Sequence, residues 1–138
     1  MPQTTAAFVI ESQEPLASAF TSEAGVDYGL LRLSKGFTGG IEATSTVEML
    51  FTRTPREDGS FGGAGYVALE RITGTVDGRS GSFALLHIST VDVGQSQWSR
   101  WPISPGSGTG ELAGITGTGR IDIAEDGSHT LLLDYELG

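Results

Sequence analysis

The feature of this sequence that most constrains its fold is a repeated alternation of apolar and polar residues, in runs separated by glycine, proline or Asp-Gly. Alternation with a period of two places successive side chains on opposite faces of an extended strand, whereas an amphipathic helix needs apolar residues three and four positions apart. Helical spacing is missing from nearly the whole chain. The sequence therefore predicts an all-β protein.

Eight stretches carry the alternating pattern, and we expect one strand in each. The expected strands cover residues 4–12, 28–37, 41–52, 65–76, 79–91, 97–103, 111–124 and 128–137. Three stretches between them are too irregular for strands, and we expect loops at residues 13–27, 53–64 and 93–97. Because connecting loops often carry function, these three are candidate functional segments.

Short turn signals indicate how these strands are connected. Asp77-Gly78 and Asp126-Gly127 can serve as two-residue loops because their residues tolerate positive φ, and Gly39-Gly40 can form the same tight turn. Such turns make consecutive strands antiparallel neighbours in a meander. An open sheet of eight strands would leave two unpaired edges, and closure removes both. We therefore predict an eight-stranded antiparallel β-barrel; a two-sheet sandwich is the alternative, although its strands are usually shorter.

The length and the charge of the chain limit its size class and its partners. At 138 residues we expect one domain, residues 1–138, because a chain of this length buries about 68% of its unfolded surface in one modest core. Its 17 acidic and 8 basic residues give a formal net charge of −9, and the basic residues form no cluster. Phosphate backbones and anionic lipids would be repelled, so we expect neither a nucleic-acid nor a membrane partner.

The sequence also lacks the residues that several kinds of chemistry need. It has no cysteine, which removes disulfides, thiolate metal sites and cysteine nucleophiles. Its two histidines, His87 and His129, lie far apart, so we expect no metal centre and no cofactor. Residues 1–13 lack the basic and apolar segments of a signal peptide, and no apolar run could cross a bilayer. We therefore expect a soluble protein that remains in the cytoplasm.

The Asp77-Gly78 turn decides which side chains of its two strands share a face. With a two-residue loop there, Glu70 stands opposite Leu85 and Ala68 opposite His87. Glu70 and His87 then become diagonal neighbours whose side chains can meet. The other large members of the same face are Tyr66, Phe83 and Leu85. The opposite face of this hairpin is just as apolar, so alternation alone does not identify the face that lines the lumen.

Glu70 and His87 are the candidate catalytic pair. An apolar lining raises the pKa of a carboxyl, and a neighbouring imidazole can then exchange a proton with it near neutral pH. The alternative is a buried hydrogen bond that fixes the strand register, because structural ion pairs also have perturbed pKa values. The sequence leaves both interpretations open.

Large side chains complete the candidate substrate-binding site. Trp98, Trp101 and Tyr66 are the large rings available to form a stacking wall for a planar or polyene ligand, with Trp98 and Trp101 on opposite sides if their segment is extended. Ordinary aromatic packing is the alternative for each ring. The register expected from Gly39-Gly40 puts Arg32 and Glu48 on opposite faces, where they cannot pair. The expected substrate-binding residues are Tyr66, Phe83, Leu85, Trp98 and Glu48.

Apolar residues on both faces of the central hairpin bear on the oligomeric state. If one face lines the lumen, the other remains exposed unless loops or a second subunit cover it. We expect a homo-oligomer. The alternative is that scattered leucine and valine side chains are simply exposed, as they are on many strand exteriors.

Three segments carry a resemblance to a known group of proteins. They are Gly-Arg-Ser-Gly-Ser-Phe at residues 78–83, Ser-Gly-Thr-Gly-Glu-Leu-Ala-Gly at 107–114 and Leu-Asp-Tyr at 133–135, together with Tyr66, Leu69, Glu70, Gly74 and His87. With these segments the chain, over about residues 4–137, resembles an uncharacterised bacterial family with an allene-oxide-cyclase-like, lipocalin-like β-barrel. Similar barrels occur in plant allene oxide cyclases and some bacterial polyketide cyclases. The resemblance implies a fold, and no catalytic residue of those enzymes is carried over to this chain.

Two functional hypotheses follow, both with a small apolar molecule as the partner. The first is a cofactor-independent cyclase or isomerase whose lumen holds a polyketide-like or lipid-like substrate in a reactive conformation, with Glu70 and His87 moving protons. The second is a non-catalytic carrier, which needs the lumen but no proton chemistry. An eight-stranded barrel has room for about one small ligand in either case. A lumen filled by side chains, in a purely structural domain, is a third possibility.

Overall fold

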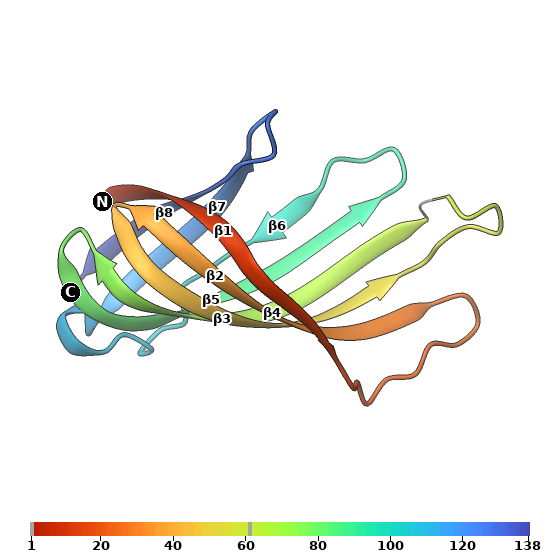
Figure 1. The fold of residues 1–138 in the computed structure, drawn as a ribbon, viewed down its shortest axis with the longest axis horizontal. Coiled ribbons are helices and arrows are strands. Elements are labelled where there is room, and N and C mark those ends of the chain that lie inside the picture. The colour runs from red at the N-terminus through yellow and green to blue at the C-terminus, as the bar shows by residue number, and fades with distance from the viewer. Residues whose placement is uncertain (1, 61) are drawn as a thin grey trace.

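Each alternating stretch of the sequence contains a strand in the computed structural model, which describes residues 2–60 and 62–138 (Figure 1). The strands are β1 (Gln3–Leu16), β2 (Asp27–Gly39), β3 (Ile41–Arg53), β4 (Gly63–Val76), β5 (Arg79–Asp92), β6 (Trp98–Arg100), β7 (Ile115–Ile123) and β8 (His129–Leu137). A single 3-10 turn, η1 (Gly110–Leu112), precedes β7. The all-β prediction is confirmed. No helix formed by the described residues is long and apolar enough to cross a bilayer.

The strands follow one another in antiparallel meander order, and β1 also pairs with β8, so the sheet curls into a nearly closed barrel. A short segment, residues 101–103, spans the remaining gap between β5 and β7. In this closing segment Ile103 N donates to Gly117 O at 2.9 Å, and Gly119 N donates to Trp101 O at 2.8 Å. The predicted eight-stranded barrel is therefore confirmed, with a sixth strand shorter than the expected 97–103.

The two ends of the barrel differ in how the strands are joined. Tight turns between β2 and β3 and between β4 and β5 lie at the same end as both chain termini, whereas the longer loops after β1, β3, β5 and β7 lie at the other end (Figure 1). We call these the closed end and the open end. Side chains that are almost wholly buried fill the closed end, among them Ile41, Ile72, Val76, Phe83, Leu112 and Ile115.

Two of the glycine-rich segments pack against each other at the closed end. Gly81, in residues 78–83, lies so close to residues 107–114 that a Cβ added to it would be 2.0 Å from Thr109 O. Thr109 N donates to Ser82 O at 2.9 Å, and Ser80 N donates to the Glu111 carboxylate at 3.1 Å. Residues 78–83 and 107–114 therefore form one clasp. Their packing explains why η1 replaces the strand that we expected from residue 111.

The predicted strand registers differ in their outcomes. At Asp77-Gly78 the two-residue turn is confirmed, with φ of 47° and 85° and with Val76 paired to Arg79. The register expected from Gly39-Gly40 is wrong by one residue, because Gly40 N donates to Thr5 O on β1 rather than closing a two-residue turn. As a result Arg32 and Glu48 stand directly opposite each other.

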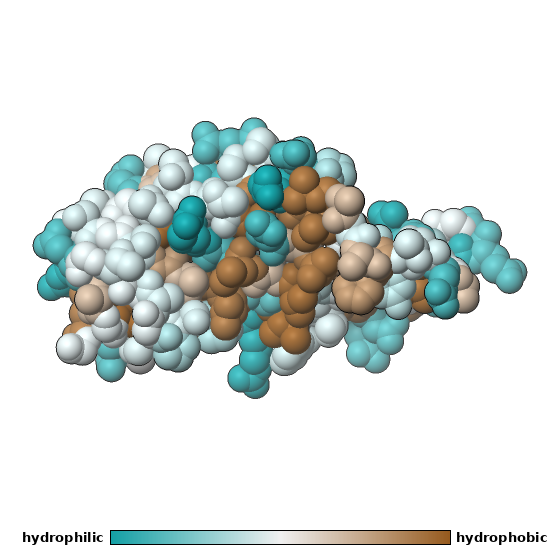
Figure 2. All heavy atoms as spheres, turned by 90° about the horizontal axis from the view of Figure 1, so that it is seen from below, coloured by the Kyte–Doolittle hydropathy of each residue, from teal (hydrophilic) through white to brown (hydrophobic). Residues whose placement is uncertain are grey.

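The outer face of the barrel carries an apolar patch across β3, β4 and β5 (Figure 2). Register places Leu50 beside Val67 and Val67 beside Ile88, with Leu69 beside Leu86 in the next row. Each of these five side chains is between 37% and 53% exposed. Both faces of the β4–β5 hairpin are therefore apolar, and only one of them lines the lumen.

Candidate functional site

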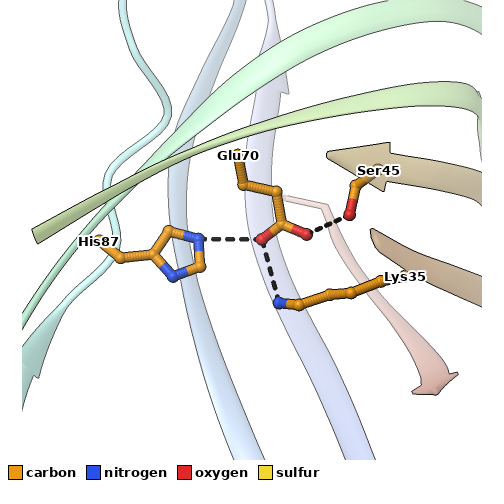
Figure 3. Close-up of polar contacts among 4 residues, drawn as sticks. All are labelled: Lys35, Ser45, Glu70 and His87. Carbon is orange, nitrogen blue, oxygen red and sulfur yellow. Dashed lines mark hydrogen bonds and ion pairs between the residues drawn. The ribbon is translucent and has the colours of Figure 1, made fainter. Parts of the chain in front are cut away.

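The lumen contains a buried cluster of four polar side chains, contributed by four consecutive strands (Figure 3). Glu70 on β4 and His87 on β5 are 1% and 5% exposed, and Lys35 on β2 and Ser45 on β3 are 6% exposed. Alternation along each strand turns these positions inward, and register brings them together: Lys35 pairs with Ser45, and Ala68, two residues before Glu70, pairs with His87. The face of the hairpin that carries Glu70 is therefore the luminal face.

Glu70 is the centre of this cluster. Lys35 Nζ donates to Glu70 Oε1 at 3.3 Å, and Ser45 Oγ donates to Glu70 Oε2 at 2.5 Å. His87 Nε2 lies 2.9 Å from Glu70 Oε1, although its N–H direction misses the oxygen by too much for a regular hydrogen bond. The Glu70 carboxylate is thus in contact with an ammonium group, a hydroxyl and an imidazole, which come from three other strands.

These partners determine the charge of Glu70. Burial by itself would raise the pKa of this carboxyl, but the adjacent His87 ring, the Lys35 ammonium and the Ser45 hydroxyl together hold its pKa below the usual 4.5. Glu70 is therefore ionised at neutral pH. The direction is opposite to the rise in pKa expected from an apolar lining, because His87, Lys35 and Ser45 together outweigh the effect of burial.

His87 is held as a neutral imidazole. Burial lowers the pKa of His87 from its usual 6.5 and outweighs the opposing effect of the Glu70 carboxylate, while the nearby Lys35 ammonium lowers it further. The ring packs against Trp101, with 3.7 Å between the ring centroids. A neutral histidine in a fixed orientation can accept a proton at neutral pH.

A cavity lies above the cluster, toward the open end. Lys35 and His87 line it, whereas Glu70 lies behind them. Its apolar wall includes Phe8, Leu33, Val47, Met49, Tyr66 and Trp101. The cavity is continuous with a stretch of the outer faces of β1, β7 and β8, and the whole space has a volume of about 760 Å³.

A scan against family models assigns the chain to a family over nearly its whole length. The model described as "Protein of unknown function (DUF3224)" matches residues 4–135. The chain belongs to the DUF3224 family. A solved structure of a DUF3224 protein of unknown function from Shewanella oneidensis MR-1 is similar, with 34% identity over 100% of this chain and 98% of that one and a TM-score of 0.88. A search of curated proteins found no match.

Membership in DUF3224 confirms the uncharacterised family that the glycine-rich segments indicated, and the similar structure covers the complete barrel. The comparisons give no support for the narrower likeness to allene oxide cyclases. The reaction and the substrate are therefore inferred from the site itself.

The structure places the other predicted site residues in three different surroundings. Tyr66 lines the cavity as expected. Phe83 and Leu85 share its face but are fully buried in the core below the cavity. Trp98 and Glu48 differ from the expectation that they face a ligand, because both point outward: Trp98 is 47% exposed on β6, and Glu48 forms an ion pair with Arg32 at 3.7 Å.

Lys35 and Ser45 were not expected in the site, and Trp101 was expected only as one of three rings that could form a stacking wall. The register expected from Gly39-Gly40, which separated Arg32 from Glu48, in the same way put Lys35 and Ser45 on opposite faces of the sheet. One signal was available: Lys35 is the chain's single lysine, and it alternates in phase with Leu33 and Phe37, which are apolar. A charged residue on the apolar face of a strand indicates a buried partner of opposite charge.

Among the residues that the structure describes, no three His, Asp or Glu side chains are close enough together to hold a metal ion. What the cluster offers is one fixed negative charge, one fixed positive charge and one neutral imidazole beside an apolar cavity. This arrangement can bind a polar group of an otherwise apolar ligand and can move a proton.

Proposed function

We propose that this DUF3224 protein binds a small, mainly apolar molecule in its lumen and converts it without a cofactor, as an isomerase or a cyclase. One observation carries the proposal: a neutral, buried histidine is fixed between the Glu70 carboxylate and the Trp101 ring at the floor of an apolar cavity. In an isomerisation or ring closure a proton leaves one atom and returns to another, so a single base that can accept and return it is sufficient.

The residues have distinct roles in this proposal. His87 is the catalytic base, because it lines the cavity where a substrate would lie. Glu70 is a positioning residue: it does not reach the cavity, but it holds the ring and stabilises the imidazolium that forms when His87 accepts a proton. The apolar wall restricts a flexible substrate to reactive conformations, which by itself can lower the barrier by several kcal/mol.

As part of this proposal, the barrel is of the allene-oxide-cyclase-like kind, the substrate is polyketide-like or lipid-like, and the protein is located in the cytoplasm. We also propose that a second copy of the chain covers the apolar patch on β3, β4 and β5. The patch supports self-association because its five side chains form a continuous surface across three paired strands.

A carrier without catalysis is the second candidate, and a specific observation favours it. Both oxygens of Glu70 already have donors within the protein, as they would in a purely structural network. A carrier would need the cavity and the apolar wall only.

The two candidates are distinguished by exposing the protein to an organic extract of the cells in which it occurs. A carrier retains a compound unchanged, which native mass spectrometry detects as a bound mass. An isomerase or a cyclase converts a compound into one of the same mass but a different retention time in liquid chromatography. We expect this conversion with the natural protein and its loss in His87→Gln. A lumen that retains nothing and converts nothing would contradict both candidates.

A further inference from the structure

The polar groups at the floor of the cavity balance one another in charge. The Lys35 ammonium lies 3.3 Å from the ionised Glu70 carboxylate, and His87 is neutral. A ligand carboxylate placed here would add a second negative charge close to Glu70, in a region that burial shields from water, and like charges at such a site repel strongly. The cluster therefore favours a ligand that is neutral when it binds.

The cluster also presents one donor and one acceptor to that ligand. Lys35 has three N–H donors, and the described residues provide one hydrogen-bond acceptor for them, Glu70 Oε1; the face of the Phe8 ring lies 4.6 Å from Nζ. In His87 the carboxylate beside Nε2 favours the tautomer with the proton on that atom, which leaves the lone pair on Nδ1. No described residue donates a hydrogen bond to Nδ1.

The donor and the acceptor are close enough to act on one functional group. Lys35 Nζ and His87 Nε2 lie 3.3 Å and 2.9 Å from the same oxygen, Glu70 Oε1, so the two nitrogens are at most about 6 Å apart. The acceptor Nδ1 lies across the imidazole ring from Nε2. A carbonyl oxygen and the hydrogen on the adjacent carbon are about 3 Å apart, and contacts of about 3 Å from Lys35 to the oxygen and from His87 to the C–H group extend the ligand across the gap between the two side chains. A ligand oxygen on Lys35 thus places an adjacent carbon near the imidazole.

We propose that the substrate is a neutral, mainly apolar carbonyl compound with a C–H bond next to the carbonyl, that Lys35 binds the carbonyl oxygen, and that His87 removes the adjacent proton. This inference rests on the proposed isomerase function and names its substrate class.

The proposed step balances in atoms and in charge. The C–H bond breaks, its proton moves to His87 Nδ1, and its electron pair forms the carbon–carbon double bond of an enolate whose negative charge lies on the oxygen. The imidazolium then faces Glu70 and the enolate oxygen faces Lys35, so each new charge meets an opposite charge that was in place beforehand. Return of the proton to the opposite face of the same carbon gives the epimer, and in a substrate with a second double bond conjugated with the enolate, return to the far end of that bond gives the double-bond isomer. Either return regenerates neutral His87.

Three probes of one carbon skeleton test the substrate class by binding: 2-tetralone, which has an enolisable ketone, tetralin, which lacks it, and tetralin-2-carboxylate, which is anionic. We expect 2-tetralone to bind about tenfold more tightly than tetralin, because it gains a hydrogen bond from a charged donor, and the carboxylate to bind more weakly than the ketone. If tetralin binds as tightly as 2-tetralone, or the carboxylate binds most tightly, the substrate class is wrong while the apolar binding site stands. If none of the three binds, the proposed function itself is overturned.

Exchange of the C1 protons of 2-tetralone with deuterium in D2O, followed by NMR, tests the proton transfer. We expect the protein to accelerate exchange above the rate in buffer, and His87→Gln to reduce this acceleration on the order of 100-fold while 2-tetralone still binds. Unchanged exchange in His87→Gln, or no acceleration by the natural protein, would overturn the step.

Lys35 is tested by removal of its charge. We expect Lys35→Met to lose both the preference for 2-tetralone over tetralin and the exchange activity. Because this variant leaves the Glu70 carboxylate without its cation, the double variant Lys35→Met/Glu70→Gln serves if the single one does not fold. Arg71→Gln removes a positive charge from the outer face of β4, next to Glu70 in the chain, and should change neither property. A double variant that still prefers the ketone would contradict the role of Lys35.

Discussion

The closed end and the open end of the barrel are built from the same strands but have different tasks. At the closed end the inward side chains are aliphatic or aromatic and almost wholly buried, and the clasp of residues 78–83 and 107–114 covers them. A few residues further along the same strands, the inward side chains are Lys35, Glu70 and His87 beside a cavity. We infer that the closed end supplies the stability that allows the open end to keep charged groups and empty space.

The largest expected effect tests this division by a truncation at each end. Phe83→Ala removes a ring that is 1% exposed at the closed end and should lower the free energy of unfolding by about 3–5 kcal/mol. Ile123→Ala at the open end removes a side chain that is 66% exposed and should cost less than about 1 kcal/mol. Denaturation with urea measures both. Equal losses would show that the two ends contribute alike.

A double-mutant cycle at the floor of the cavity sharpens the comparison. Glu70→Leu leaves the Lys35 ammonium buried without its carboxylate, and we expect a loss of about 3 kcal/mol in the free energy of unfolding. In Lys35→Met/Glu70→Leu both charges are gone, and much of that loss should be recovered because no unpaired charge remains. Calorimetry or urea denaturation measures the cycle. Additive losses would mean that the two side chains do not stabilise each other.

The pH dependence of stability should also come from the open end. Because the pKa of His87 is lower in the folded protein than its usual 6.5, the unfolded chain binds more protons, and the free energy of unfolding should fall as the pH falls below about 6.5. The lowered pKa of Glu70 adds a further loss below about 4.5. His87→Gln should remove the loss between these two values. His129→Gln is the matched control and should retain it.

The smallest expected effect on stability concerns the outer patch. Val67→Glu/Leu69→Lys places opposite charges on side chains that are about half exposed, so the free energy of unfolding should change by less than about 1 kcal/mol. If a second copy covers the patch, the same variant should shift the protein to monomers in sedimentation velocity. Val9→Glu, on the outer face of β1, is the control and should leave the mass unchanged. A natural protein that is already monomeric would refute the proposed self-association.

The turns at Gly39-Gly40, Asp77-Gly78 and Asp126-Gly127 show which features of the fold and of the site could be predicted from the sequence. Alternation of side chains was sufficient for the all-β class, the number of strands and the meander, because each depends on local pattern. At Asp77-Gly78 both residues adopt positive φ, so the dipeptide alone determined the register and placed Glu70 beside His87. For that reason the centre of the candidate site was predictable.

The other two turns depend on contacts that the dipeptides do not reveal. At Asp126-Gly127 the expected two-residue loop is longer, because Ala124 N donates to Ser128 O and Ile123 pairs with His129. At Gly39-Gly40 the loop bonds to β1, which is distant in the sequence. A shift of one residue moves every side chain of a strand to the other face of the sheet. For that reason Lys35 was not expected in the site, and Glu48 was wrongly expected there.

The closing segment gives the barrel a built-in route for local opening. Strands β1 to β5 are joined along long ladders, such as the one from Ile41–Val76 to Arg53–Ala64, whereas two backbone hydrogen bonds join residues 101–103 to β7. The amides of Ile103 and Gly119 should therefore be among the first barrel amides to exchange with solvent deuterium. Since Trp101 is part of this segment and also packs on His87, opening here would release the ring that holds the imidazole. Ligand entry and reorganisation of the site would then be the same motion, and a bound ligand would slow exchange at these two amides.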